Sequence, residues 1–345
     1  MQQWRRQPLL RDNWWFRNNP APTMTSMTRI AAASAALLLA FATFASAEWP
    51  DHPIKWVVPF APGGANDLIA RAAADGVSKR LKQTILVENK PGAGTIVGSE
   101  YAARSKPDGY TFLIASAGTI TNSMIRKDMP YKDDEIVPVG MIAVAPSVIV
   151  VNPSVPANNL KEFIAWAKAQ GDKGVNWSTA GVGSTPHFVA EMLKDAGVNN
   201  LTIVPFKSGS ESVTAVMAGN VQATSEASIV VIPQIKAGKL KAIADTYETR
   251  ITAYKELPTA KEQGFPGVNI GHWAGLYAPA GTPQPILDRM AAELLAAVKS
   301  NEFADKLVPQ GIEPAPLTKA GYTAFLTAER DRLGKIAKKA KMQVE

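Results

Sequence analysis

Three short glycine-rich turns carry the residues of this sequence whose types and spacing could do chemistry. They are Ala61-Pro62-Gly63-Gly64-Ala65-Asn66-Asp67, Pro91-Gly92-Ala93-Gly94-Thr95 and Ala180-Gly181-Val182-Gly183-Ser184-Thr185-Pro186-His187. Each turn leads from a strand-like apolar run into a helix-length stretch. It therefore places backbone N–H groups and a positive helix end at the carboxyl edge of a sheet, where open α/β sheets bind ligands. No Arg or Lys stands in these turns, so neutral donors would hold an anion, which favours a small carboxylate over a polyphosphate.

The polar side chains of the turns each have a second interpretation. Asn66, Ser184 and Thr185 are candidate ligand donors, but these residue types are also common N-caps. Asp67 is expected to be a structural acid of the first helical turn. A tight strand-to-helix turn needs glycine even without a ligand, and it is the recurrence of three such turns that favours a binding site.

The remaining candidates are a histidine and a fourth turn. His187 could contact a ligand or cap its helix, and both interpretations stay open. Ala117 and Thr119, in Ser116-Ala117-Gly118-Thr119 after a further strand, are a weaker addition.

Several kinds of catalytic site find no support in the sequence. The three histidines are scattered and show no metal-binding spacing, and the absence of cysteine excludes thiolate metal sites and cysteine nucleophiles. The stretch Gly92–Gly98 is GxGxxxG, which differs from the dinucleotide fingerprint GxGxxG. There is also no G-x-S-x-G nucleophile elbow.

The elements that must position these turns alternate between strands and helices. Strands are expected over 53–60, 84–88 and 110–115, with helices over about 67–81 and up to 103, which predicts a parallel, doubly wound sheet. The apolar run 139–151 is long enough to cross into a second α/β series that extends to residue 245. This series is expected to include a helix over 160–169 and a strand over 221–225. The strand-like segment 268–278 returns, and helices over 285–299 and 318–341 are expected to pack on the first lobe. Two crossings predict two lobes with a cleft between them.

The N-terminus has the features of a secretory signal peptide. Arg29 precedes an apolar run over 30–45, and Ala45-Ser46-Ala47 forms a small-x-small cleavage box. The run is too short for a membrane span, which needs about 20 apolar residues. Cleavage after Ala47 would remove residues 1–47. Lobe 1 is then predicted over 48–148 plus 273–345, and lobe 2 over 149–272.

The net charge does not indicate a nucleic-acid-binding protein. The whole chain carries +7, but the leader to Ala47 holds five arginines and one aspartate, so the mature chain carries +3. The basic cluster Lys335, Lys338, Lys339 and Lys341 has the spacing of a solvated helix face. A nucleic-acid footprint would need a clustered basic surface.

Motifs along the whole mature chain resemble those of the Bug-type extracytoplasmic receptors of tripartite tricarboxylate transporters. The matching segments are Val57-Val58-Pro59-Phe60 with Gly63-Gly64-Ala65-Asn66-Asp67, Glu88-Asn89-Lys90-Pro91-Gly92-Ala93-Gly94, Pro107-Asp108-Gly109-Tyr110-Thr111, the third turn, Val204-Pro205-Phe206-Lys207, Ala237-Gly238-Lys239-Leu240 and Leu276-Tyr277-Ala278-Pro279-Ala280-Gly281-Thr282-Pro283. Each segment is weak alone, but their order and spacing are specific.

The resemblance implies a type II periplasmic-binding-protein fold, with two doubly wound lobes joined by two crossover strands. It implies a periplasmic, non-enzymatic monomer without cofactor that binds a small organic acid and delivers it to membrane subunits. One carboxylate would be held by the loops Gly63–Asp67 and Gly181–Thr185, and the far end of the ligand would be read near Phe60 and Ala61. A receptor-fold sensor subunit and an exported enzyme acting on small acids remain the alternatives.

The sequence departs from the family pattern in three places. Thr95-Ile96 replaces the usual Gly-Asn after the second turn, and Glu226 stands where Asp is common, in an unusually polar segment over 224–228. An ionised Glu226 facing the pocket would repel a second ligand carboxylate. We therefore expect a ligand with an ammonium or a neutral far end.

Overall fold

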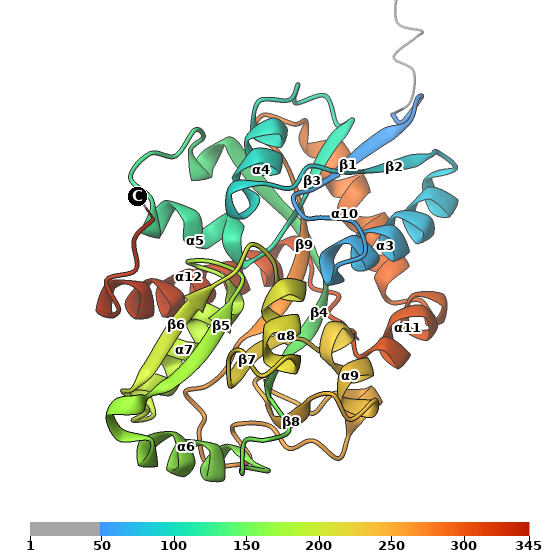
Figure 1. Cartoon of the computed structure of the whole chain (residues 1–345). Helices are drawn as coiled ribbons and strands as arrows, with labels where there is room; N and C mark the ends of the chain where they lie inside the picture. Colours follow the sequence, from blue (N-terminus) through green and yellow to red (C-terminus); the bar gives the residue numbers. More distant parts are fainter. Residues whose placement is uncertain (1–48, 345) are drawn as a thin grey trace, which may run out of the picture. The chain divides into compact units, whose positions relative to one another are not determined.

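Strands and helices alternate through the computed structural model, which describes residues 49–344 (Figure 1). The strands are β1 (Ile54–Val58), β2 (Ile85–Asn89), β3 (Thr111–Ala115), β4 (Ile136–Val151), β5 (Val175–Thr179), β6 (Leu201–Pro205), β7 (Ala223–Ala227), β8 (Lys241–Asp245), β9 (Gly271–Pro279) and β10 (Glu313–Pro314). The helices are α3 (Ala65–Leu81), α4 (Ile96–Ala103), α5 (Ala117–Ile125), α6 (Leu160–Ala169), α7 (Thr185–Asp195), α8 (Gly209–Met217), α9 (Ser228–Lys236), α10 (Gln284–Val298), α11 (Asn301–Leu307) and α12 (Lys319–Lys339). The predicted leader and its cleavage site lie outside the described residues.

One long strand connects the two halves of the sheet. The strands follow the order β2-β1-β3-β9-β4-β7-β5-β6, and β8 and β10 also pair with β4. Residues 136–146 of β4 pair with β9, whereas residues 147–151 pair with β7 and 148–151 with β8. The pairs β1–β2, β1–β3, β5–β6 and β5–β7 are parallel, while β4 and β9 run antiparallel to their neighbours. We call the part around β1–β3 the first lobe and the part around β5–β8 the second lobe.

Helices cover both faces of each lobe, as a doubly wound sheet requires. In the first lobe, α3 and α10 pack against each other. α3 also contacts β2, α10 also contacts β4, and α4 contacts β1 and β3. In the second lobe, Val148 and Val150 of β4 pack with residues of α8 and α9, and Ile149 and Val151 pack with residues of α6 and α7. This alternation follows from the two-residue period of a strand. The fold is a mixed α/β, two-lobe binding-protein fold with β4 and β9 as the crossover strands.

The capping, turn and periodicity patterns of the sequence predicted most element boundaries correctly. For example, the predicted helix 160–169 is α6, which begins after Asn159 because the Asn159 carbonyl oxygen Oδ1 accepts the N–H of Glu162 at 2.8 Å. The sequence did not predict α5 or α11. It placed the strand before Glu226 over 221–225, whereas β7 runs over 223–227 and contains Glu226.

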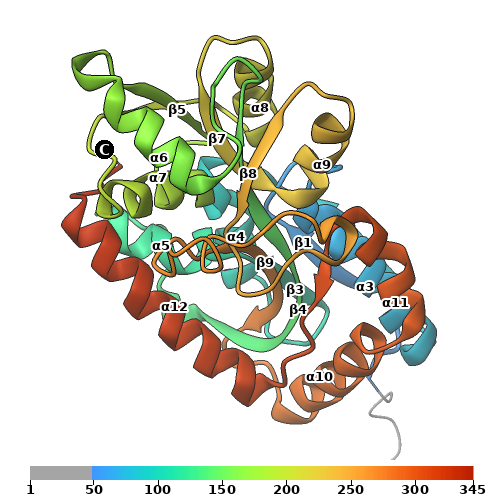
Figure 2. The same cartoon turned by 90° about the horizontal axis from the view of Figure 1, so that it is seen from below.

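The last helix packs on both lobes rather than on the first alone. Tyr322 and Leu326 of α12 belong to the first-lobe core, but Leu333 and Ala337 lie in the core of the second lobe. A helix of 21 residues spans about 30 Å, enough to pass from one core to the other. Figure 2 shows α12 passing α5 toward α7, in agreement with its contacts to both helices. The lobe boundaries at 148 and 272 stay a prediction.

Candidate functional site

The first glycine-rich turn connects β1 to α3 and is held in shape by one carboxylate. Asp67 Oδ2 accepts the N–H of Gly63 at 2.9 Å and Nε–H of Arg71 at 3.0 Å, and Oδ1 accepts the amide of Asn89 at 2.9 Å. Burial raises the pKa of Asp67, but the hydrogen bonds from Arg71, Gly63 and Asn89 outweigh burial and leave the pKa below its ordinary value. The ionised Asp67 therefore fixes the loop, as expected of a structural acid.

The same network leaves the tip of the first turn open. Asn89 also donates to the carbonyl of Phe60 at 3.1 Å, so β2 holds both ends of the turn. Ala61, Pro62 and Gly63 are exposed, and Gly64 precedes α3 without a side chain capping the helix. The first turn of a helix has N–H groups with no partner inside the helix. This end of α3 therefore offers backbone donors to an anion.

Asn66 connects this helix end to the crossover strand β9. Its side chain is buried, and its Nδ2 donates to the carbonyl of Trp273 at 3.5 Å. Asn66 is thus neither the N-cap residue, which is Gly64, nor freely directed to solvent.

The second turn has an unusual backbone and packs on α5. Gly92, Ala93, Gly94 and Thr95 all have positive φ, with Thr95 at 86°. Asn122 of α5 donates to the carbonyl of Gly94 at 2.7 Å. A β-branched residue rarely adopts positive φ, so Thr95 is a steric outlier with a backbone conformation typical of glycine. The second turn is therefore held in place by α5.

The turn after β3 begins α5 and is capped internally. Ser116 and Thr119 form a capping box, in which Thr119 Oγ1 accepts the N–H of Ser116 at 3.2 Å. Ala117 and Thr119 are buried, with 6% and 3% exposed. The Thr119 hydroxyl therefore has a structural role, which the sequence did not assign.

The third turn leads from β5 into α7 and uses its histidine as a brace. His187 Nδ1 accepts the N–H of Gly183 at 3.3 Å, and Ser184 Oγ donates to the carbonyl of Gly181 at 2.6 Å. Burial lowers the pKa of His187, and the Glu191 carboxylate opposes this only in part. The neutral imidazole thus stabilises the turn, which supports the capping interpretation. Thr185 is the first residue of α7 and is buried, while Ala180 and Ser184 are half-buried.

Glu226 lies inside β7, with its carboxylate at the beginning of another helix. The residue is 7% exposed, and its Oε1 accepts the N–H of Ala227 at 2.9 Å. A Cβ atom on Gly209, the first residue of α8, would lie 2.0 Å from Glu226 Oε2. A carboxylate at this end is stabilised by the helix dipole.

His272, which the sequence did not assign to the site, is the neighbour of this carboxylate on β9. Its Nε2 lies 3.5 Å from Glu226 Oε1. Burial lowers the pKa of His272, although the Glu226 carboxylate opposes the shift. The adjacent Trp273 carbonyl is the acceptor for Asn66. β9 therefore connects the first turn to Glu226. The pairing of β9 with β4 depends on long-range register, so no local signal could have found it.

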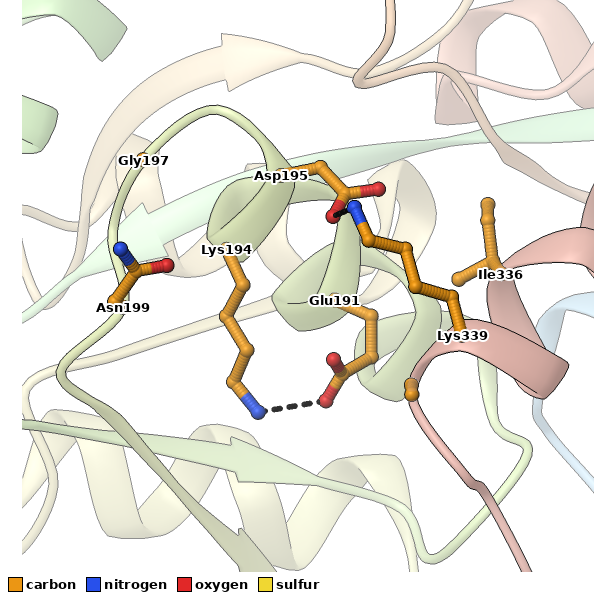
Figure 3. Close-up of a pocket in the computed structure, with 8 residues that line it drawn as sticks. Glu191, Lys194, Asp195, Gly197, Asn199, Ile336 and Lys339 are labelled. Carbon is orange, nitrogen blue, oxygen red and sulfur yellow. Dashed lines mark hydrogen bonds and ion pairs between the residues drawn. The ribbon is translucent and has the colours of Figure 1, made fainter.

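A surface hollow of about 450 Å³ lies between α7 and α12 (Figure 3). Lys194 pairs with Glu191 at 2.7 Å, and Lys339 pairs with Asp195 across the hollow. The Lys339–Asp195 pair connects α12 to α7, and because the charges of the hollow are mutually paired it has no excess charge for an anion. A second hollow of about 290 Å³, lined by Ala103, Arg104, Glu135 and Ala280, lies away from the three turns.

Two further features concern metals and membranes. Within residues 49–344, no three His, Asp or Glu side chains are grouped as a metal ion would require. Among the helices that the structure describes, none combines the length and apolar character needed to cross a bilayer.

Comparison with known proteins identifies the family. The family model described as tripartite tricarboxylate transporter family receptor matches residues 69–342. The periplasmic binding protein BugD is 31% identical, with a TM-score of 0.76 over 86% of this chain and 100% of that chain. The R. palustris protein Rpa4515, solved with adipate, is 29% identical, with a TM-score of 0.79 over 86% of this chain and 99% of that one.

A further solved relative carries a smaller acid. MatC from Rhodopseudomonas palustris, solved with bound malate, is 27% identical, with a TM-score of 0.74 over 84% of this chain and 99% of that chain. The family match covers most of the chain, and the fold agrees over nearly the full length of these structures. The chain therefore belongs to the receptor family of the tripartite tricarboxylate transporters, the family of Bug-type solute-binding proteins.

Proposed function

We propose that this protein is an extracytoplasmic receptor that captures a small carboxylate between its lobes and delivers it to the membrane subunits of a tripartite transporter. The observation that carries the proposal is that α3 and α7 begin on glycine-rich turns of different lobes, and neither turn contains a Lys or Arg. Backbone N–H groups at both ends suit a carboxylate. The adipate and malate in the two R. palustris relatives support the same ligand class.

The mechanism that we propose has three steps. The acid first binds neutral donors of the loops 61–67 and 180–185. The lobes then close around it, which requires that the acid bind the closed state more tightly than the open state. The closed form finally docks on its membrane partner as a monomer. No step breaks a covalent bond, so the protein acts as a receptor rather than an enzyme.

We infer the cellular location from the leader and the family together. A signal peptide cleaved after Ala47 would export the chain, and the relative BugD is a periplasmic binding protein. The mature protein would then begin at Glu48 and meet its ligand in the periplasm.

The test is a thermal-shift screen of residues 48–345 against mono-, di- and tricarboxylates, amino acids and aromatic acids, with nucleotides and sugars as controls. A ligand at 100 times its Kd stabilises the fold by about 2.7 kcal/mol, which gives a shift of several degrees. A positive result among the acids would support the proposal. Stabilisation by nucleotides or sugars alone would contradict it.

We further propose that Glu226 selects the far end of the ligand. Its Oε1 is engaged by the Ala227 N–H, and among the described residues no hydrogen bond involves Oε2. An ammonium group of an amino acid would pair with this carboxylate, whereas a second ligand carboxylate would be repelled. The variant Glu226→Gln should lose about tenfold affinity for glutamate and gain affinity for dicarboxylates such as malate. The ratio of the two Kd values, from calorimetry, measures the effect, and an unchanged ratio would remove Glu226 from this role.

A further inference from the structure

The end of α5 lies against the third turn, although α5 begins in the core of the other lobe. Ala117, Thr121 and Ile125 follow one another at intervals of four residues, so they share a face of the helix. Ala117 packs in the first-lobe core, whereas Ile125 is buried among second-lobe residues such as Phe188 of α7. The helix α5 therefore begins in one core and ends in the other.

The third turn lies so close to the end of α5 that a methyl group on Gly183 would require the Ile125 side chain to move. A Cβ atom on Gly183 would lie 2.4 Å from Ile125 Cδ1 and 4.0 Å from Thr121 Oγ1. At Gly181, two residues earlier, a Cβ atom would meet nothing within 4 Å. Both glycines have positive φ, at 78° and 101°. The contact with α5 is therefore particular to Gly183.

A buried hydroxyl without a partner lies in the same contact. Thr121 is 0% exposed, and its Oγ1 has no hydrogen-bond partner among the described residues. A buried polar group normally has one, because an unpaired hydroxyl destabilises the fold. The Thr121 hydroxyl faces the turn that also presents the N–H groups of α7.

The C-terminal tail fixes α5 in this position. The N–H of Val344 donates to the carbonyl of Ile125 at 2.9 Å, and Met342 is buried in the same second-lobe core. The last turn of α5 is thus held by the segment 342–344, which follows α12. The position of Ile125 is set by the tertiary structure and does not depend on the third turn alone.

We propose that Thr121 and Ile125 of α5 form a seat for the loop 180–185 and set the position in which this loop binds the ligand. The inference rests on the proposed function and adds Ile125 and Gly183 as positioning residues. Thr121 adds a hydroxyl that lies beside Gly183 and has no partner among the described residues, so it is available to the loop or to the carboxylate that the loop binds. Because α5 begins in the first-lobe core and ends at Ile125 in the second-lobe core, its contact with the loop couples ligand capture to the arrangement of the lobes.

The test compares two glycines of the same turn that both have positive φ. Gly181→Ala and Gly183→Ala both place a side chain at positive φ, but Gly183→Ala alone places it against Ile125 Cδ1. Ile125→Val removes that one atom, so the double variant Gly183→Ala with Ile125→Val should fit again. Each variant is titrated calorimetrically with malate, adipate, glutamate and any acid found by the thermal-shift screen.

We expect Gly181→Ala to bind within about threefold of the natural protein and Gly183→Ala to bind at least tenfold more weakly, with most of the loss restored in the double variant. Thr121→Val should raise Tm and weaken binding severalfold, while Thr121→Ser should retain binding. Equal binding by the two glycine variants, or a double variant that binds no better than Gly183→Ala, would overturn the proposal that α5 positions this loop. If the natural protein binds no acid, the proposed function fails and this inference falls with it.

Discussion

At the scale of single residues, buried carboxyl groups divide into two kinds. Asp67 accepts three hydrogen bonds and has a lowered pKa, so it is a fixed negative anchor for the first turn. Asp245, at the end of β8, is 0% exposed, and its Oδ2 has no partner among the described residues. A buried carboxyl with few partners prefers its neutral form. The two aspartates should therefore respond to pH in opposite directions.

Asp245 gives a prediction for the pH dependence of stability. Burial raises its pKa to about 7; the N–H groups of Tyr247 and Ile251 oppose the shift, and the charges of Glu313 and Glu262 add to it. Since the folded pKa lies above the unfolded value of 3.8, the stabilisation is complete below pH 3.8 and is lost as the pH rises through about 7. From pH 5 to pH 8 this group should lower the free energy of unfolding by about 2–3 kcal/mol.

The measurement is urea unfolding at a series of pH values. Asp245→Asn keeps the shape of the side chain but cannot ionise, so its free energy of unfolding should vary less over pH 5–8 than that of the natural protein. Identical pH profiles for the two proteins would show that Asp245 does not titrate in this range.

At the scale of elements, three helices position the glycine-rich turns. The capping box at Ser116 begins α5, the brace of His187 shapes the start of α7, and the long helix α12 packs on both cores. Of these, α12 makes the most extended connection between the lobes. Its Arg332 also donates to the carbonyl of Asn269, just before β9. Motion between the lobes must therefore bend, slide or release part of α12.

The packing of the second half of α12 can be tested by shortening one buried side chain. Leu333 is 0% exposed in the second-lobe core, so Leu333→Ala should lower the free energy of unfolding by about 2–5 kcal/mol through lost burial and the resulting cavity. The exposed Lys335, on the same helix, provides the control. Lys335→Ala should stay within about 0.5 kcal/mol of the natural protein. A small effect of Leu333→Ala would mean that this half of α12 is not docked in solution.

At the scale of the whole molecule, the function depends on two lobes that meet through a few connections. β4 runs through both halves of the sheet and changes its partner from β9 to β7 between residues 146 and 147. At this point Thr246 Oγ1 donates to the carbonyl of Ser147 at 2.9 Å. Such a hinge allows a rigid closure around a ligand. Closure converts binding to two weak helix ends into one enclosed site.

Closure should be visible by small-angle X-ray scattering. The acid that gives the largest thermal shift, added at about 100 times its Kd, is expected to lower the radius of gyration, because it must favour the compact state that contacts it from both lobes. An acid that gives no thermal shift, at the same ionic strength, serves as the control. A saturated complex with an unchanged radius would contradict capture by lobe closure.

The sequence by itself determined the features that depend on near neighbours. The turns 61–67, 91–95 and 180–187, the helix 160–169 and the apolar crossover run could be predicted, because capping, turn chemistry and periodicity act within a few residues. The alternation of strands and helices then fixed a doubly wound fold. The family motifs, read in order, specified the rest of the architecture.

Only the tertiary structure decided how these parts meet. The position of Glu226 beside His272 and Gly209 depends on the pairing of β7 and β9 with β4, which brings together residues far apart in the chain. The contact of α5 with the third turn, through Ile125 and Gly183, likewise joins residues far apart in the chain. The role of α12 in both cores depends on its length and on the register of its buried face. Long-range packing leaves no short pattern in the sequence, so these contacts could be seen only in the folded molecule.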